Sequence, residues 1–233
     1  MSERYAVYFT PPNGSALRRF GGQWLGYDPH DGEIPCAAEA FGLDRDDLED
    51  LTGTPRVYGF HATLKPPFRL VGNGDPSALH AAAAALAQQF QVFPMPRLRL
   101  SRLGDFLALV PEVPEPRLDD IAGACVRQLD AFRAEPHPED LARRRAAGLS
   151  DRQEELLQRW GYPYVFDEFR FHMTLTRTLD EEEHARVEPV LAGALQPVLA
   201  QPLAFDALSL MRQWNAREPF VEIARLPLSE TQA

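Results

Sequence analysis

Two short segments of the chain place a threonine two residues after a histidine. They are Phe60-His61-Ala62-Thr63-Leu64 and Phe171-His172-Met173-Thr174-Leu175, which agree at four of five positions. Side chains alternate between the two faces of a β-strand, so each histidine would share a face with its threonine. The three apolar residues of each segment would lie on the opposite face. One face therefore suits a hydrophobic core, and the other would carry an imidazole and a hydroxyl.

Two such strands brought together would suit in-line displacement at phosphorus. An unperturbed histidine titrates near pH ~6.5, so one of His61 and His172 can be neutral while the other is protonated. The neutral ring would take a proton from the attacking oxygen, and the charged ring would give one to the leaving oxygen. Thr63 and Thr174 would hydrogen-bond the non-bridging phosphate oxygens. This chemistry needs no metal, and we expect no cofactor; the residues alone do not decide which histidine is the acid.

The two segments belong to a longer repeat. The order strand, helix, strand, strand occurs twice, beginning with motif strands expected at Val57–Leu64, before Pro66-Pro67, and at Glu168–Leu175. A repeat of this kind predicts one domain with two similar lobes related by a pseudo-two-fold axis. We expect a first lobe over about 57–134, a second over about 164–226 with the strand 4–10 added, and a charged helical insertion on the surface over about 135–163.

Four further residues are candidates for binding substrate. Lys65 follows His61 by four positions, so on a regular strand it would share the histidine's face and offer a positive charge to phosphate. Arg177 follows His172 by five positions and would reach the site only if the strand end twists. Tyr8 and Tyr58 would line the cleft, although both also suit a core.

Composition limits the class of protein. The chain has 233 residues and a net charge of −10, with no long basic stripe, which disfavours binding to long nucleic acid. It shows no apolar stretch long enough for a membrane span and no secretory signal. Two lone cysteines, Cys36 and Cys125, provide neither a disulfide framework nor a zinc site. We expect a cytoplasmic protein with a small anionic phosphate ester as its substrate; no oligomeric state follows.

These features resemble the 2H phosphoesterase superfamily, which is named for two His-x-Thr or His-x-Ser motifs. The segments RYAVYFTPP, YGFHATLKPPF, LSDRQEELLQRWGYPYV and FRFHMTLT are similar to the branch described as putative phosphonate metabolism proteins. The resemblance implies an α+β fold with two pseudo-symmetric lobes, antiparallel sheets facing a central cleft and helices packed outside. It also implies that His61 and His172 are catalytic and that Thr63 and Thr174 bind the phosphate.

Three functions are open at this point. The first is a metal-independent phosphodiesterase that hydrolyses a small sugar or nucleotide cyclic phosphate, which the family resemblance extends to a ribosyl cyclic phosphate from phosphonate degradation. The second is an RNA-end-processing 2′-5′ ligase or cyclic phosphodiesterase, which would need a basic groove. The third is a non-catalytic protein that binds a phosphate ligand. A metal site on the two histidines lacks a third ligand at suitable spacing.

Overall fold

The fold is α+β, with one seven-stranded antiparallel sheet at its centre. The computed structural model describes residues 3–35, 37–72, 74–146 and 148–230, so Cys36 lies outside the described residues. The sheet has the strand order β11-β10-β1-β4-β8-β7-β6. Its strands are β1 (Arg4–Phe9), β4 (Ala62–Phe68), β6 (Leu98–Leu103), β7 (Phe106–Pro111), β8 (Met173–Thr174), β10 (Ala207–Gln213) and β11 (Val221–Pro227).

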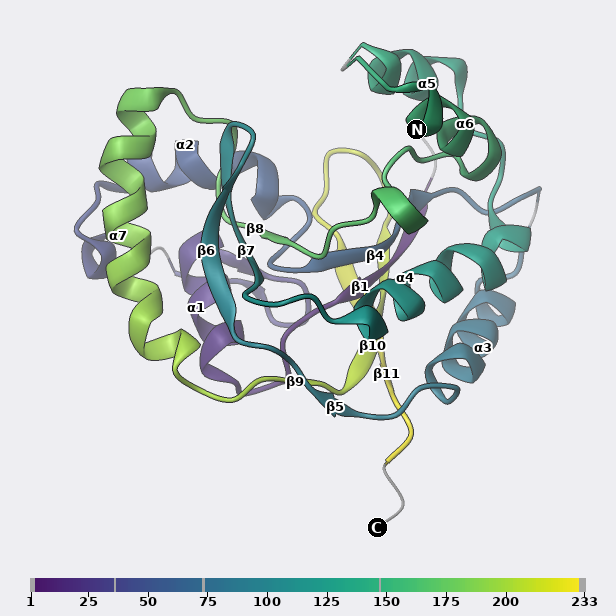
Figure 1. Cartoon of the computed structure of the whole chain (residues 1–233), viewed down its shortest axis with the longest axis horizontal. Coiled ribbons are helices and arrows are strands. Elements are labelled where there is room, and N and C mark those ends of the chain that lie inside the picture. Colours follow the sequence, from purple (N-terminus) through teal and green to yellow (C-terminus); the bar gives the residue numbers. More distant parts are fainter. Residues whose placement is uncertain (1–2, 36, 73, 147, 231–233) are drawn as a thin grey trace.

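Helices and short strands surround this sheet (Figure 1). The α-helices are α1 (Ala16–Leu25), α2 (Arg45–Arg56), α3 (Pro76–Ala87), α4 (Pro116–Gln128), α5 (Pro138–Arg145), α6 (Asp151–Trp160) and α7 (Glu181–Leu199). Two small ladders join β2 (Tyr27–Asp28) to β3 (Gly32–Glu33) and β5 (Phe93–Pro94) to β9 (Ala204–Phe205). The 3-10 helices are η1 (Ala38–Phe41), η2 (Asp130–Phe132) and η3 (Phe166–Glu168). No described helix is long and apolar enough to cross a membrane.

The sheet consists of two half-sheets that meet at one pair of strands. We call β11, β10, β1 and β4 the first half-sheet and β8, β7 and β6 the second; Ala62 of β4 pairs with Met173 of β8 between them. Helices α3 and α4 pack on the first half-sheet, and α7 packs on the second and against α1. The expected α+β class with antiparallel strands is confirmed, but the strands of both halves belong to one continuous sheet.

Each half-sheet combines strands from both sequence repeats. The first motif strand, β4, pairs with β1, and β1 pairs with β10 of the second repeat. The second motif strand, β8, pairs with β7 of the first repeat. The segments expected as separate lobes, 57–134 and 164–226, therefore exchange their hairpins within the sheet. The exchange places the two motif strands side by side at the centre.

The charged insertion forms α5 and α6, which project from one end of the molecule (Figure 1). Helix α6 begins with the capping box that Ser150 and Gln153 predict, since each side chain bonds the other's backbone N–H. Neither residue is buried, and the α5 helix buries none of its side chains. Helix α6 buries Leu156 and Leu157, and Leu156 packs in a small cluster with Val126 of α4 and Val165. The insertion therefore forms a surface layer beside the sheet that is attached through this separate cluster.

Helix α1 supports both motif strands from the core side. Phe60, which precedes His61, is buried and packs directly over Gly21 of α1. Trp24 of the same helix is fully buried, and its indole Nε1 donates a 2.8 Å hydrogen bond to the carbonyl oxygen of Leu175. Burying an aromatic side chain of this size stabilises the fold by roughly 1.5–3 kcal/mol. One helix therefore fixes the backbone on which both histidines stand.

Replacing Gly21 with alanine tests this support. A methyl group there would lie 2.1–2.6 Å from three Phe60 side-chain atoms, so the ring must move. We expect Gly21→Ala to destabilise the protein by about 1–3 kcal/mol, although alanine favours helices. Gly193→Ala in α7 is the matched control, because no atom lies within 4 Å of its added methyl. Urea unfolding would measure both variants; equal stability of the two would contradict the packing described here.

Candidate functional site

The two His-x-Thr motifs face the same side of the sheet. Ala62 and Met173 form an antiparallel pair, and both are fully buried in the main core. Because side chains alternate along a strand, the residues on either side of this pair point to the opposite face. Continuing the antiparallel register places His61 across from Thr174 and Thr63 across from His172. All four of these side chains are partly exposed. The predicted pairing of two imidazoles with two hydroxyls is therefore present.

Both imidazole rings are oriented by the backbone in the same way. The Nδ1 of His61 lies 2.8 Å from the carbonyl oxygen of Gly59, and the Nδ1 of His172 lies 2.8 Å from that of Arg170. A carbonyl oxygen only accepts, so each Nδ1 carries the proton and each neutral ring presents an unprotonated Nε2. The Nε2 of His61 lies 3.0 Å from the Oγ1 of Thr63. The first motif thus offers a proton acceptor next to a hydroxyl.

A glycine in a turn holds the carbonyl that orients His61. Gly59 has a φ of +73°, a left-handed conformation that glycine adopts without strain. A side chain there would also collide with Pro29, whose Cγ would lie 2.2 Å from the added carbon. The backbone N–H of Glu222 donates to the carbonyl oxygen of Pro29 at 2.8 Å, which fixes this loop on β11. The position of His61 therefore depends on a glycine that motif matching did not single out.

An aromatic ring lies beside each histidine, and the two contacts differ. Tyr8 of β1 stacks on His61, with ring centroids 3.7 Å apart and planes inclined by 24°. Phe106 of β7 lies near His172, with centroids 5.9 Å apart. Tyr58 completes the cluster at 6.2 Å from the His61 ring. Tyr8 and Tyr58 both lie beside His61, and Tyr8 is the more closely packed of the two.

Burial makes both histidines harder to protonate. Desolvation lowers the pKa of His61 to about 4; the Gly59 carbonyl opposes this shift, and a charge on His172 would add to it. Desolvation also lowers the pKa of His172, against the opposing effect of the Arg170 carbonyl. At neutral pH, and without a bound anion, both rings are therefore neutral. A phosphate group in the site would favour protonation of one of them.

Lys65 does not reach this face, contrary to the prediction. The β1–β4 register shifts between the pairs Tyr8–Thr63 and Val7–Lys65, so two steps on β4 match one step on β1. This β-bulge reverses the alternation and turns Lys65 toward the helices. Its ammonium is 2% exposed and donates to the carbonyl oxygen of Val126 at 3.1 Å. A second register shift follows, and the strand continues through Pro66-Pro67 instead of ending before them.

Arg177 is also held away from the histidines. Its guanidinium forms ion pairs with Asp50 of α2 and Glu183 of α7. The hydrogen bonds that its guanidinium donates to these two carboxylates raise the pKa of Arg177. The predicted approach to the site required a twist at the end of the strand, but the two acidic side chains hold Arg177 between α2 and α7.

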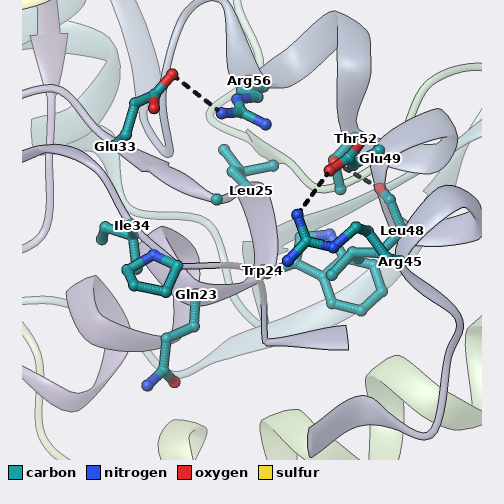
Figure 2. Close-up of a pocket in the computed structure, with 12 residues that line it drawn as sticks. Gln23, Trp24, Leu25, Glu33, Ile34, Arg45, Leu48, Glu49, Thr52 and Arg56 are labelled. Atoms are coloured by element: carbon teal, nitrogen blue, oxygen red, sulfur yellow. Dashed lines mark hydrogen bonds and ion pairs between the residues drawn. The ribbon is translucent and has the colours of Figure 1, made fainter. Parts of the chain in front are cut away.

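A cavity separate from the histidines lies between α1, α2 and β3. It measures about 420 Å³, and neither His-x-Thr motif lines it (Figure 2). Its charged side chains neutralise each other, since Arg45 pairs with Glu49 at 3.7 Å and Arg56 pairs with Glu33 at 3.6 Å. The cavity therefore offers no unpaired positive charge to an anion. Within the ranges that the structure covers, no three histidine, cysteine, aspartate or glutamate side chains gather as a metal site.

Comparison with known proteins identifies a family and two named relatives. The family model described as "Protein of unknown function (DUF1045)" matches residues 63–221. "Ribose 1,5-bisphosphate phosphokinase PhnN" of Janthinobacterium sp. (strain Marseille) is 40% identical over 97% of this chain and 51% of its own length. The protein of the same name from Laribacter hongkongensis (strain HLHK9) is 39% identical over 90% of this chain and 51% of its own length. The chain thus spans about half the length of these relatives.

Solved structures give weaker matches. Escherichia coli LigT complexed with 3′-AMP is 13% identical, with a TM-score of 0.45 over 98% of this chain and 99% of that one. A conserved protein of unknown function from Agrobacterium tumefaciens is 13% identical, with a TM-score of 0.46 over 97% of this chain and 87% of that one. Scores below 0.5 do not establish a common fold. The account of the site therefore rests on this chain's own geometry.

The lowered pKa of His61 predicts its titration in solution. We expect the ring protons of His61 to titrate near pH 4 in an NMR experiment, well below the unfolded value of about 6.5. As the pH falls from about 6.5 to about 4, the unfolded chain binds this proton before the folded chain does. The free energy of unfolding therefore decreases over this range. A Tyr8→Leu control, which removes the stacked ring, should move the titration toward 6.5. Normal titration in the unaltered protein would contradict the described burial.

Proposed function

Because this chain belongs to the DUF1045 family of proteins of unknown function, we propose its activity from the site itself: it is a metal-independent phosphodiesterase that hydrolyses a small cyclic phosphate. The observation that carries the proposal is the Ala62–Met173 pair, which sets both His-x-Thr motifs side by side on one face. Two bases and two hydroxyls arranged in this way meet the needs of phosphoryl transfer to water. The site provides acid, base and phosphate contacts without a metal.

The different surroundings of the two histidines support different roles for them in the proposed reaction. Tyr8 covers His61, whose pKa falls to about 4, so this ring stays neutral and acts as the general base. It takes a proton from water as the water oxygen bonds to phosphorus. His172 lacks such a close stacked ring and gains a proton when the anionic phosphate binds. It gives that proton to the leaving ring oxygen as the phosphorus–oxygen bond breaks. One water is consumed, and a phosphate monoester and a hydroxyl are formed.

The threonines hold the phosphate between the two rings. Thr63 lies 3.0 Å from the Nε2 of His61, and the antiparallel register places Thr174 across from His61. Their hydroxyls can donate to the two non-bridging oxygens and keep the phosphorus in line. A hydrogen bond to a charged group contributes ~1.5–3 kcal/mol, so each threonine supports the rate less than either histidine does.

The names of the relatives narrow the substrate. Their names describe an enzyme that acts on ribose 1,5-bisphosphate. Segments of this chain also resemble the branch described as putative phosphonate metabolism proteins. Hydrolysis of ribose 1,2-cyclic phosphate 5-phosphate, with cleavage between phosphorus and O2, yields ribose 1,5-bisphosphate. The part of such a relative that matches this chain would then produce ribose 1,5-bisphosphate, which is the substrate in the kinase's name.

A kinase activity for this chain has less support. A phosphate-binding loop of the G-x-x-x-x-G-K-[ST] type requires a lysine after a glycine. The sole lysine of the sequence, Lys65, follows Leu64, and its ammonium is buried against α4. The chain therefore contains no such loop, and its site is better suited to acid–base hydrolysis.

A phosphorus NMR time course in EDTA tests the proposal. The panel contains ribose 1,2-cyclic phosphate 5-phosphate, 2′,3′-cyclic nucleotides and a 2′-5′ dinucleotide, each also incubated with the His61→Ala/His172→Ala variant. We expect the first compound to give ribose 1,5-bisphosphate with the unaltered protein and to persist with the variant. Turnover of the 2′-5′ dinucleotide alone would favour the RNA-processing alternative. No turnover of any compound would contradict the proposed activity.

The acid and base roles also predict the pH dependence of kcat/KM. The active free enzyme has a neutral His61 and a protonated His172, and burial lowers both pKa values. We expect a bell-shaped profile with its optimum below pH 6.5, because kcat/KM reports the free enzyme. Because the two rings interact, the two apparent pKa values of the profile belong to the pair and not to either histidine alone. An optimum above pH 7 in buffers of constant ionic strength would contradict the assignment.

A further inference from the structure

Five arginines gather in one small pocket of this acidic protein. They are Arg4, Arg69, Arg133, Arg143 and Arg144, and Asp140 is the one acidic residue that lines the pocket with them. The pocket lies where the insertion meets the first half-sheet. Such a cluster stands out in a chain with a net charge of −10, because it concentrates positive charge at one place.

Three of these arginines pair with a carboxylate, although Asp140 is shared by two of them. Asp140 lies 3.3 Å from Arg69 and 2.7 Å from Arg143, and Asp130 lies 2.7 Å from Arg133. Arg4 and Arg144 have no carboxylate within 4 Å in the part of the chain that the structure describes. Arg4 instead hydrogen-bonds the side-chain oxygen of Gln213, and Arg144 lies over the ring of Tyr162, with its Cζ 4.4 Å from the centroid. The pocket thus holds two positive charges without counter-charges.

Tyr8 connects this pocket to the histidines. Arg4 and Tyr8 stand on the same face of β1, four residues apart, and the Tyr8 ring stacks on His61. The Tyr8 hydroxyl is fully buried and has no hydrogen-bond partner among the described residues. Burial raises its pKa well above the usual range, and Tyr58, Arg4 and Tyr162 are near enough to act on it. A buried donor without a partner therefore lies beside His61 and close enough to Arg4 and Tyr162 to be influenced by them.

We propose that Arg144 and Arg4, with the hydroxyls of Tyr8 and Tyr162, bind a second phosphate group of the substrate. This inference rests on the proposed phosphodiesterase function and names the substrate class: a small sugar with a cyclic phosphate at one position and a phosphate monoester at another. The cyclic phosphate lies between His61 and His172, and the monoester lies in the arginine pocket.

The electrostatics of Arg144 favour an anionic ligand. Burial lowers the pKa of this guanidinium, with partial compensation from Tyr162. Arg144 is only half-buried, but a partly desolvated charge without a carboxylate partner still costs free energy. A phosphate would relieve that cost by forming paired, charge-assisted hydrogen bonds. The planar guanidinium matches two phosphate oxygens at once, which an ammonium group cannot do.

This role also explains the insertion. Arg144 belongs to α5, and Pro136 and Gly161, near the two ends of the insertion, also line the pocket. Arg69, just after β4, anchors α5 through Asp140, and Arg133 donates to the carbonyl oxygen of Arg159 at 3.2 Å. These contacts hold the insertion over the strand that carries His61. The insertion therefore selects substrates by the second phosphate and takes no part in the chemistry.

Steady-state kinetics with paired substrates test the inference. Ribose 1,2-cyclic phosphate would be compared with and without its 5-phosphate, using Arg144→Gln and the unaltered protein. We expect Arg144→Gln to lower kcat/KM about 10–100-fold for the 5-phosphorylated substrate and less than about 2-fold for the other. Arg186→Gln is the charge control, because Arg186 lies on α7 and pairs with Asp47 at 2.9 Å. Equal losses for both substrates, or none, would overturn the inference.

Calorimetry separates this inference from the proposed reaction. Ribose 1,5-bisphosphate and ribose 1-phosphate would be titrated into the same variants, so the result needs no turnover. We expect the bisphosphate to bind at least about 10-fold more tightly to the unaltered protein, and Arg144→Gln to remove this difference. If no cyclic phosphate is hydrolysed while this preference persists, the proposed function fails and the inference stands. Equal binding of the two compounds, or no binding of either, would overturn the inference.

Discussion

The pairing of Ala62 with Met173 is the constraint on which the site depends. These two core residues join the half-sheets, and their burial turns the histidine and threonine of each motif to the opposite face. Without this pair, the site would be two polar strand faces, each with one base. Helix α1 secures the pair from behind, through Phe60 on Gly21 and the Trp24 bond to Leu175. The hydrophobic core and the polar face are therefore consequences of the same alternation.

The two motifs are alike in sequence, but the aromatic rings beside their histidines differ. Both rings use Nδ1 to bond the carbonyl two residues earlier, so both present Nε2 in the same state. Only His61 has a ring stacked 3.7 Å away, and this contact comes from the N-terminal strand, outside the repeat. Two equal histidines would compete for the same proton. In the proposed mechanism, the different surroundings of the two rings let one accept a proton while the other donates one, as acid–base catalysis requires.

The sequence predicted the faces of the two motifs and the surface insertion because these features depend on local alternation and on a repeat. The strand bounds were wrong, since β4 covers Ala62–Phe68 instead of Val57–Leu64 and β8 covers only Met173–Thr174 of the expected Glu168–Leu175. It did not predict the position of Lys65, since a β-bulge depends on how β4 pairs with β1. It also placed Arg177 near the site, because the carboxylates of Asp50 and Glu183 come from helices distant in sequence.

The arginine pocket illustrates the same limit of sequence reasoning. Arg4 and Arg144 are 140 residues apart and meet only after the insertion folds back onto the first half-sheet. In the sequence, Arg144 stands among Arg143 and Arg145, which indicates no more than a solvated helix face. Tertiary contacts alone distinguish the arginine over Tyr162 from its two neighbours, which pair with Asp140 and Glu154.

The central claim is that the two motifs form a single catalytic unit. It is tested most directly by comparing kcat/KM on the cyclic phosphate for His61→Ala, for His172→Ala and for the double variant. If the histidines act as one acid–base pair, each single variant will lose nearly as much activity as the double variant. If the two losses instead multiply, so that each histidine contributes independently, the account of one shared site is wrong.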